Sequence, residues 1–173
     1  MSGYEGVMKR IFFLISLVFF LSPPVAFGEE IIGTYGSWEA FTTKENKKLV
    51  CYMGSEPKKA VGKYKKRGKT FVLVTHRPAE KSTNVISVQA GYTYKKGSKV
   101  EVTIGKATFK LFVSDGYAFT YDAVDDNKVV QAMVRGVLMT ISGISERNTL
   151  TKDTYFLNGF SAAYKAISKA CKI

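Results

Sequence analysis

The amino-acid sequence predicts an all-β protein, an antiparallel β-sandwich or flattened barrel of about eight strands with a C-terminal α-helix. One observation behind this prediction is the alternation of apolar and polar side chains between residues 99 and 122. Two dipeptides, Gly105-Lys106 and Asp115-Gly116, interrupt the alternation. Both accept the positive backbone angles of tight hairpins, so the segment is expected to form a three-stranded meander. The other observation is an apolar stripe at helical spacing after residue 158.

The N-terminus has the pattern of a signal peptide over residues 1–28. Residues 8–28, MKRIFFLISLVFFLSPPVAFG, place two cations before an apolar run that ends at two prolines. Ala26 and Gly28 supply the small side chains that signal peptidase requires, which predicts cleavage before Glu29. The apolar run has about eleven residues, whereas a helix that spans a bilayer needs about 20, so removal is favoured over retention as an anchor. Residues 29–173 are then expected to form one exported domain.

Short segments on both sides of the meander are predicted as further strands. Each combines β-branched or aromatic residues with polar neighbours at a period of two. They cover residues 37–42 around Trp38, 48–53 around Cys51, 70–76, 84–94, 138–143 and 149–157.

Two segments have helical spacing instead. Residues 128–137, KVVQAMVRGV, favour a short helix that Asp125 or Asp126 caps and that ends at Gly136. The C-terminal segment NGFSAAYKAISKAC favours a longer helix. Its apolar stripe contains Phe160, Ala163, Tyr164, Ile167, Ala170 and Cys171.

The composition limits the chemistry available to the protein. Of 173 residues, 26 are Lys or Arg and 14 are Asp or Glu, which gives a formal charge of +12. Two cysteines and one histidine cannot assemble a four-cysteine zinc site or a site of two cysteines and two histidines. We therefore expect no metal and no cofactor.

The two cysteines, Cys51 and Cys171, are expected to form a disulfide. Two cysteines are the number that one disulfide needs. In an oxidising compartment such a bridge would join an early strand to the last helix. The alternative is two free thiols, one of them catalytic. We favour the structural role.

Two motifs resemble catalytic signatures but lack their context. The segment Gly62–Thr70, GKYKKRGKT, resembles a phosphate-binding loop, but five residues separate its glycines and a strand follows it where a helix should begin. We interpret it as a solvated hairpin. Gly159–Ala163 half-matches a nucleophile elbow around Ser161, with Ala163 in place of the second glycine. Ser161 is therefore expected at a helix start.

His76 and an acidic group complete the candidates. A single imidazole at the end of a strand is expected to satisfy local hydrogen bonds, since it cannot complete a metal site alone. Asp122, Asp125 and Asp126 could suggest calcium, but the twelve-residue ligand loop is absent. Helix capping explains them better.

Positive charge is concentrated between Lys44 and Lys69, where ten basic and two acidic side chains occur. Such a segment attracts anions, and the expected partner is an anionic envelope or host-surface component. Nucleic acid fits poorly with export, and any membrane association would be peripheral. The alternative is a solubilising face without a specific partner. The candidate anion-binding residues are Lys58, Lys59, Lys63, Lys65, Lys66, Arg67 and Lys69.

Five segments together resemble a known family. They are GTYGSWEAF, VCYMGSEPKKAVGKYKKRG, VTHRPAEKS, AGYTYKKGSKVEVTIGKATFKLF and TKDTYFLNGFSAAYKAISKAC, and the last is the most specific. The chain resembles the invasion-associated locus B family of alphaproteobacterial exported proteins. The resemblance implies a periplasmic or outer-membrane-associated β protein, linked in some pathogenic members to host-cell invasion or stress survival. None of the five segments is a catalytic signature.

The function expected from the sequence is that of an exported, non-enzymatic envelope protein that presents a basic binding face. Two alternatives stay open. One is a hydrolase whose site the linear sequence does not reveal, and the other is a purely structural envelope protein.

Overall fold

The computed structural model describes residues 28–114 and 116–173. The expected signal peptide, residues 1–28, lies outside the described residues apart from Gly28. Neither helix of the described region has both the length and the apolar composition needed to cross a bilayer.

The described residues contain one antiparallel sheet of eleven strands, in the order β1-β2-β3-β5-β6-β9-β8-β7-β10-β11-β4. The predicted all-β class with a C-terminal helix is confirmed, although the sheet is open and has more strands than the expected eight or so. The strands are β1 (Glu30–Tyr35), β2 (Trp38–Glu45), β3 (Lys48–Ser55), β4 (Lys59–Gly62), β5 (Phe71–Arg77), β6 (Ser82–Gln89), β7 (Lys99–Ile104), β8 (Ala107–Ser114), β9 (Tyr117–Phe119), β10 (Leu138–Ile144) and β11 (Leu150–Phe156).

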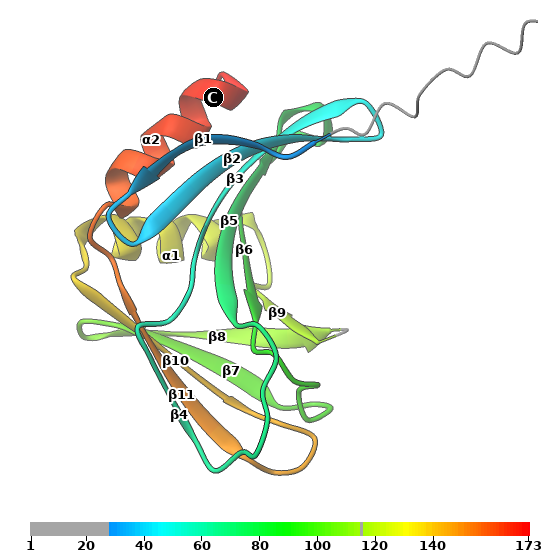
Figure 1. Cartoon of the computed structure of the whole chain (residues 1–173), viewed down its shortest axis with the longest axis vertical. Coiled ribbons are helices and arrows are strands. Elements are labelled where there is room, and N and C mark those ends of the chain that lie inside the picture. The colour runs from blue at the N-terminus through cyan, green and yellow to red at the C-terminus, as the bar shows by residue number, and fades with distance from the viewer. Residues whose placement is uncertain (1–27, 115) are drawn as a thin grey trace, which may run out of the picture.

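The sheet is strongly bent (Figure 1). The half that contains β1, β2 and β3 lies above the half that contains β7, β8, β10, β11 and β4, and β5 and β6 run between them. β3 and β4 follow one another in the chain, yet β3 is third in the sheet and β4 is at its far end beside β11. The segment from β3 to β5 therefore links the two halves.

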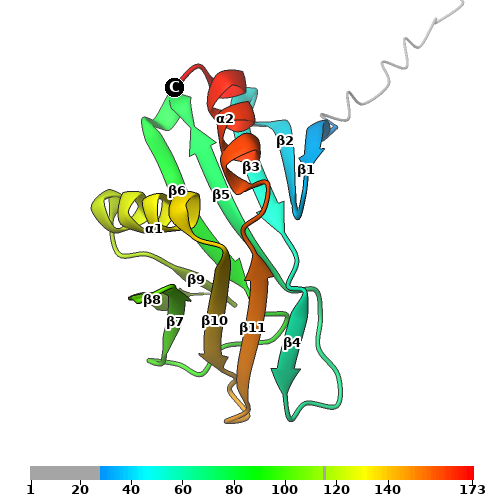
Figure 2. The same cartoon turned by 90° about the vertical axis from the view of Figure 1, so that its left-hand side faces the viewer.

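Two α-helices lie on the same side of the sheet, in front of the strands in Figure 2. α1 (Ala123–Arg135) packs on β6, and α2 (Phe160–Cys171) packs on β1, β2, β3 and β5. A short 3₁₀ helix, η1 (Pro78–Glu80), connects β5 to β6. Both predicted α-helices are confirmed, and α1 is followed by Gly136 as expected.

The cap of α1 differs from the prediction. Asp122 caps the helix by accepting a hydrogen bond from the Asp125 backbone N–H at 2.8 Å, so the choice of Asp125 or Asp126 was wrong. Asp126 is buried and accepts hydrogen bonds from the Ile86 backbone N–H at 2.8 Å and from the Thr120 hydroxyl. It therefore anchors α1 to β6.

The core forms between the inward side of the sheet and the apolar stripe of α2. Trp38 and Phe160 are fully buried and meet edge to face, with ring centroids 4.9 Å apart. The Trp38 indole N–H donates to the Phe156 carbonyl at 3.0 Å. The first strand residue after the β1–β2 turn is thus joined both to α2 and to the end of β11.

A close backbone approach sets the start of α2. Gly159 has a φ of +87°, and a Cβ added there would lie 1.8 Å from the Tyr35 carbonyl oxygen. Beside it, the Ser37 backbone N–H donates to the Asn158 carbonyl at 3.1 Å. Only glycine combines this φ with this contact, so the turn between β1 and β2 fits against the link from β11 to α2.

Strands β1 and β4 were not predicted. β4 is an edge strand, and the segment interpreted as a solvated hairpin is the end of this strand followed by a loop over residues 63–70. Exposed lysines flank β4 at Lys59 and Lys63. Lysines at such positions discourage edge-to-edge pairing with other chains.

Candidate functional site

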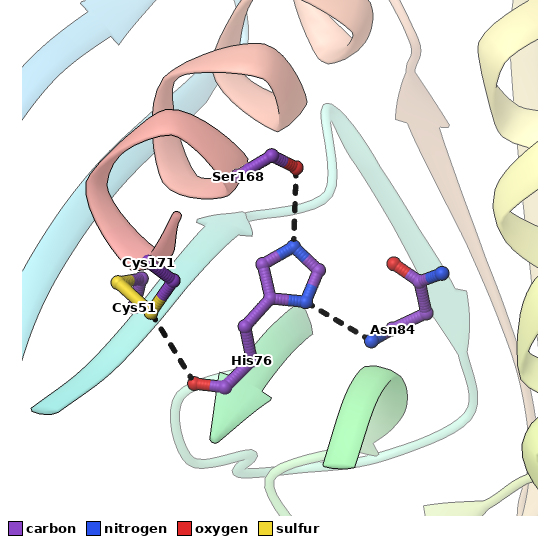
Figure 3. The surroundings of a disulfide bond; sticks show 5 residues. All are labelled: Cys51, His76, Asn84, Ser168 and Cys171. Atoms are coloured by element: carbon purple, nitrogen blue, oxygen red, sulfur yellow. Dashed lines mark hydrogen bonds between the residues drawn. A yellow bond between two sulfur atoms is a disulfide. The ribbon is translucent and has the colours of Figure 1, made fainter. Parts of the chain in front are cut away.

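The predicted disulfide is present (Figure 3). It joins Cys51 in β3 to Cys171, the last residue of α2, with Cα atoms 5.9 Å apart. Among the described residues no cysteine is free. The bridge ties the C-terminal helix to the early part of the sheet, as the sequence predicted.

His76 lies beside this bridge and is fully buried. Its Nδ1 accepts a hydrogen bond from the Asn84 backbone N–H at 3.1 Å, and its Nε2 faces the Ser168 hydroxyl at 3.4 Å (Figure 3). Burial lowers the pKa of His76 to about 4, so the ring is neutral at physiological pH. These contacts fit a ring that holds α2 against β5 and β6.

Ser161, the other residue considered for catalysis, is the second residue of α2. This confirms its predicted place at a helix start. His76 interacts instead with Ser168, seven residues further along α2. Among the described residues, no hydrogen bond joins Ser161 to His76.

The basic segment does not form one continuous face. Lys63, Lys65 and Lys66 line a cleft of about 660 Å³. Lys58 and Lys69 line a separate groove over β2, β3 and β5. The remaining lysine, Lys59, is exposed on β4, where it pairs with Thr154 of β11.

Arg67 was expected to be part of the solvated face, and this expectation was wrong. Its guanidinium donates to both carboxylate oxygens of Asp153 at 2.6 Å and, through Nε, to the Ala90 carbonyl at 2.5 Å. The side chains of Arg67 and Asp153 are 6% and 3% exposed. Burial lowers the pKa of Arg67, but the bonds to Asp153 outweigh this effect and raise it overall, so the guanidinium stays protonated beside its partner.

Two tyrosine rings enclose the Arg67 guanidinium. The guanidinium carbon lies 5.5 Å from the centroid of Tyr64 and 5.2 Å from that of Tyr92. Such stacking suits the flat, delocalised cation of arginine and adds to its ion pair. Arg67 is therefore a positioning residue, which pins the loop over residues 63–68 to the rest of the sheet.

Two further loops complete the cleft. The 91–98 connection and the 145–149 turn lie with the 63–68 loop toward the lower end of the molecule in Figure 1. The Gly68 N–H donates to the Gly91 carbonyl and the Glu146 N–H donates to the Thr93 carbonyl, both at 2.9 Å. We call this site the basic cleft; its lining includes Lys63, Tyr64, Lys65, Lys66, Tyr92, Thr93, Glu146, Arg147 and Thr149.

Sequence analysis missed Arg147, Tyr92 and Asp153 as parts of this site. Arg147 is an isolated cation far along the chain from the lysine-rich segment, so no local pattern connects the two. Asp153 does carry a signal, because it alternates with Thr151 and Tyr155 on the inward side of β11. A carboxylate on the buried side of a strand predicts a cationic partner.

The groove that contains Lys58 and Lys69 is chemically different. It occupies about 910 Å³, and its lining includes the half-buried side chains of Phe41, Tyr52, Phe71 and Leu73. The Phe41 and Tyr52 rings stack with centroids 5.1 Å apart. The groove lies on the side of the sheet opposite α2, and its lining combines these apolar side chains with carboxylates, among them Glu39, Glu45 and Glu56.

Comparison with known proteins identifies the family. A family model described as invasion associated locus B (IalB) protein matches residues 38–168. The chain belongs to the IalB family. The match includes all three loops of the basic cleft and Cys51, whereas Cys171 lies just beyond it.

A solved IalB-type structure shows the same fold. The chain is similar to the crystal structure of invasion associated protein B from Bartonella henselae, with a TM-score of 0.54 and 18% identity. The similarity covers 81% of this chain and 96% of that chain. No match was found among curated proteins. The IalB assignment rests on the family model, and the solved structure shows the shared fold.

Proposed function

We propose that this IalB protein is an exported, non-enzymatic envelope protein, and that its basic cleft binds an anionic envelope or host-surface component. The observation that carries the proposal is the convergence of Lys63, Lys65, Lys66 and Arg147 on one cleft. These residues come from two loops that are distant in the sequence. Their shared cleft has one acidic lining residue, Glu146.

The state of Arg67 supports the same proposal. Asp153 pairs with the buried Arg67, so this carboxylate is already engaged and is not the partner of the exposed lysines. The exposed lysines keep their charge available for a ligand. A concave site lined by cations raises the local concentration of anions and increases their rate of association.

Export is supported by two features of the chain. One is the signal-peptide pattern of residues 1–28, and the other is the Cys51–Cys171 bridge. Disulfides persist in oxidising compartments and are rare in the cytosol. The intact mass of the protein purified from the envelope tests this part: we expect the mass of residues 29–173 with one disulfide, and a chain that keeps its first 28 residues would contradict it.

Charge reversal tests the binding role. We expect the variant Lys63→Glu/Lys65→Glu/Lys66→Glu to lose at least tenfold in its affinity for purified envelope fractions, measured by co-sedimentation at low and physiological salt. The matched control is Lys106→Glu/Lys165→Glu/Lys169→Glu, which makes the same change in net charge at exposed positions outside the cleft. Equal association of both variants would favour a purely structural envelope role instead.

A further inference from the structure

The dimensions of the basic cleft favour a compact ligand. Its volume of about 660 Å³ lies within the range of about 300–1,000 Å³ that is typical of small-molecule sites. Its walls come from the 63–68 loop, the start of the 91–98 connection and the 145–149 turn. A flat bilayer would contact the rim of such a cleft but would leave its interior unfilled. A ligand made of one or a few small building blocks fits inside the cleft.

The charge of the cleft favours a phosphate group over a carboxylate. Lys63, Lys65, Lys66 and Arg147 line it, against the single acid Glu146. A phosphate monoester carries about −1.5 to −2 charges at neutral pH, whereas a carboxylate carries one. The planar fork of arginine binds carboxylate and phosphate alike, and lysine also binds phosphate, as a compact point charge. Here the fork of Arg67 is already used by Asp153, so the three lysines and the exposed Arg147 supply the positive charge of the cleft.

The uncharged part of the lining favours a saccharide. Tyr64 is 37% exposed, so part of its ring is open to the cleft while Arg67 covers another part. Thr93 and Thr149 add hydroxyl groups to the same lining. A sugar ring presents C–H groups on its faces and hydroxyls at its edge, and tyrosine and threonine match both, since the ring is apolar and the hydroxyls donate and accept. A site for a simple anion would need neither.

The cleft is also held in place before any ligand binds. Arg67 anchors one loop through Asp153 and the Ala90 carbonyl. The Lys95 side chain donates to the Asn148 side-chain oxygen at 2.7 Å, which ties the second loop to the third. A site that is ordered in advance spends less of its binding free energy on ordering loops.

We infer that the ligand of the basic cleft is a phosphorylated saccharide, with the phosphate near Lys63, Lys65 and Lys66 and the sugar ring against Tyr64. This inference rests on the proposed function, because it names the ligand class of the same cleft. The phosphate could belong to a free sugar phosphate or to the saccharide part of an envelope glycolipid.

Calorimetric titration of residues 29–173 tests the inference with four probes. They are glucose 1-phosphate, the phosphorylated oligosaccharide from fully deacylated lipopolysaccharide, the same oligosaccharide after removal of its phosphates, and phosphatidylglycerol vesicles. We expect the phosphorylated oligosaccharide to bind at least tenfold more tightly than its dephosphorylated form and than the vesicles, counted per accessible lipid. Glucose 1-phosphate distinguishes the two possible sources of the ligand. If it binds as tightly as the phosphorylated oligosaccharide, the ligand is a free sugar phosphate. If it binds more weakly, the ligand is the saccharide part of a glycolipid.

Two variants assign the binding to the cleft. Lys65→Ala/Lys66→Ala is expected to weaken binding of the phosphorylated oligosaccharide at least tenfold. Tyr64→Leu is expected to weaken it at least threefold while leaving the weak binding of phosphatidylglycerol vesicles unchanged. The matched control, Lys165→Ala/Lys169→Ala, removes two exposed lysines from α2 and is expected to bind like the unmodified protein. Thermal unfolding of each variant checks that it is folded.

The outcomes separate this inference from the proposed function. Equal binding of the phosphorylated and dephosphorylated oligosaccharides overturns the role of the phosphate. Vesicle binding as tight as oligosaccharide binding, through the same lysines, overturns the saccharide but keeps an anion-binding function. Absence of oligosaccharide binding, with envelope association still lost on charge reversal, overturns the inference alone. Unchanged envelope association on charge reversal overturns the proposed function.

Discussion

Two regions of this IalB protein are each held by a link between distant parts of the chain, and the links differ in kind. At the helix end, Cys51 and Cys171 form a covalent bond across 120 positions. At the basic cleft, Arg67 and Asp153 form a buried ion pair across 86 positions. The disulfide stays closed when the chain unfolds, whereas the ion pair exists only in the folded protein.

The difference shows how the two links contribute. A disulfide stabilises mainly by restricting the unfolded chain, so it needs little from its surroundings. A buried ion pair must recover the cost of removing two charges from water, and it does so only with good geometry and further hydrogen bonds. The bidentate contact, the Ala90 carbonyl and the two tyrosine rings meet that requirement around Arg67. In return, the pair positions the loop that carries the lysines.

Loss of the disulfide is expected to have the largest effect on stability. The variant Cys51→Ser/Cys171→Ser removes a loop constraint of about 120 residues, which the chain-entropy model values at about 5 kcal/mol. Urea unfolding at pH 7 measures the change, and the unmodified protein with a reductant is the control. A loss below about 1 kcal/mol would show that the bridge adds little to a fold already held by Trp38, Phe160 and their neighbours.

Loss of the ion pair is expected to rank next. Arg67→Ala leaves the Asp153 carboxylate buried without its partner, which costs about 3–5 kcal/mol. The double variant Arg67→Met/Asp153→Leu is expected to recover most of this stability, because it removes both charges together. Urea unfolding of the three proteins measures both effects. A double variant no more stable than Arg67→Ala would show that the cost comes from lost packing and not from the unpaired carboxylate.

Acid is expected to weaken the helix end through His76. The ring stays neutral in the folded protein because burial lowers its pKa to about 4, while in the unfolded chain it takes up a proton near pH 6.5. The unfolded state therefore binds more protons between these values. The free energy of unfolding should fall by about 2 kcal/mol from pH 7 to pH 5. His76→Gln, measured by urea unfolding at the two pH values, should show a drop smaller by that amount, and an equal drop in both proteins would assign the effect to other groups.

The smallest expected effect concerns Tyr155. This side chain is fully buried, and its hydroxyl has no hydrogen-bond partner among the residues that the structure describes. Burial raises its pKa, so the hydroxyl stays protonated. Tyr155→Phe removes an unsatisfied polar group and is expected to leave stability unchanged or raise it by up to about 1 kcal/mol. Thermal unfolding measures this, and a clear loss would reveal a partner for the hydroxyl.

Sequence patterns were most reliable where the determining interactions are local. The glycines at positions 105 and 116 and the apolar stripe from Phe160 to Cys171 each act through neighbouring residues, and the meander and α2 follow from them. β4 was missed because a strand of four residues becomes a strand only through its pairing with β11. The cap of α1 was misplaced because Asp122, Asp125 and Asp126 are equally suited to capping, and burial against β6 determines which of them is turned inward.

The sequence alone determined the class of the fold and the pair of cysteines, because alternation, helical spacing and a count of two thiols need no knowledge of distant contacts. The family followed from the resemblance of whole segments to known proteins. Tertiary structure determined which side chains of the lysine-rich segment are buried and which line the basic cleft. Arg67 looks as solvated as its neighbours along the chain, and only the folded sheet brings Asp153 and Tyr92 to it. The same folding brings Arg147 into one cleft with Lys63, Lys65 and Lys66. Charge attraction depends on distance in space, which the order of residues in a chain does not record.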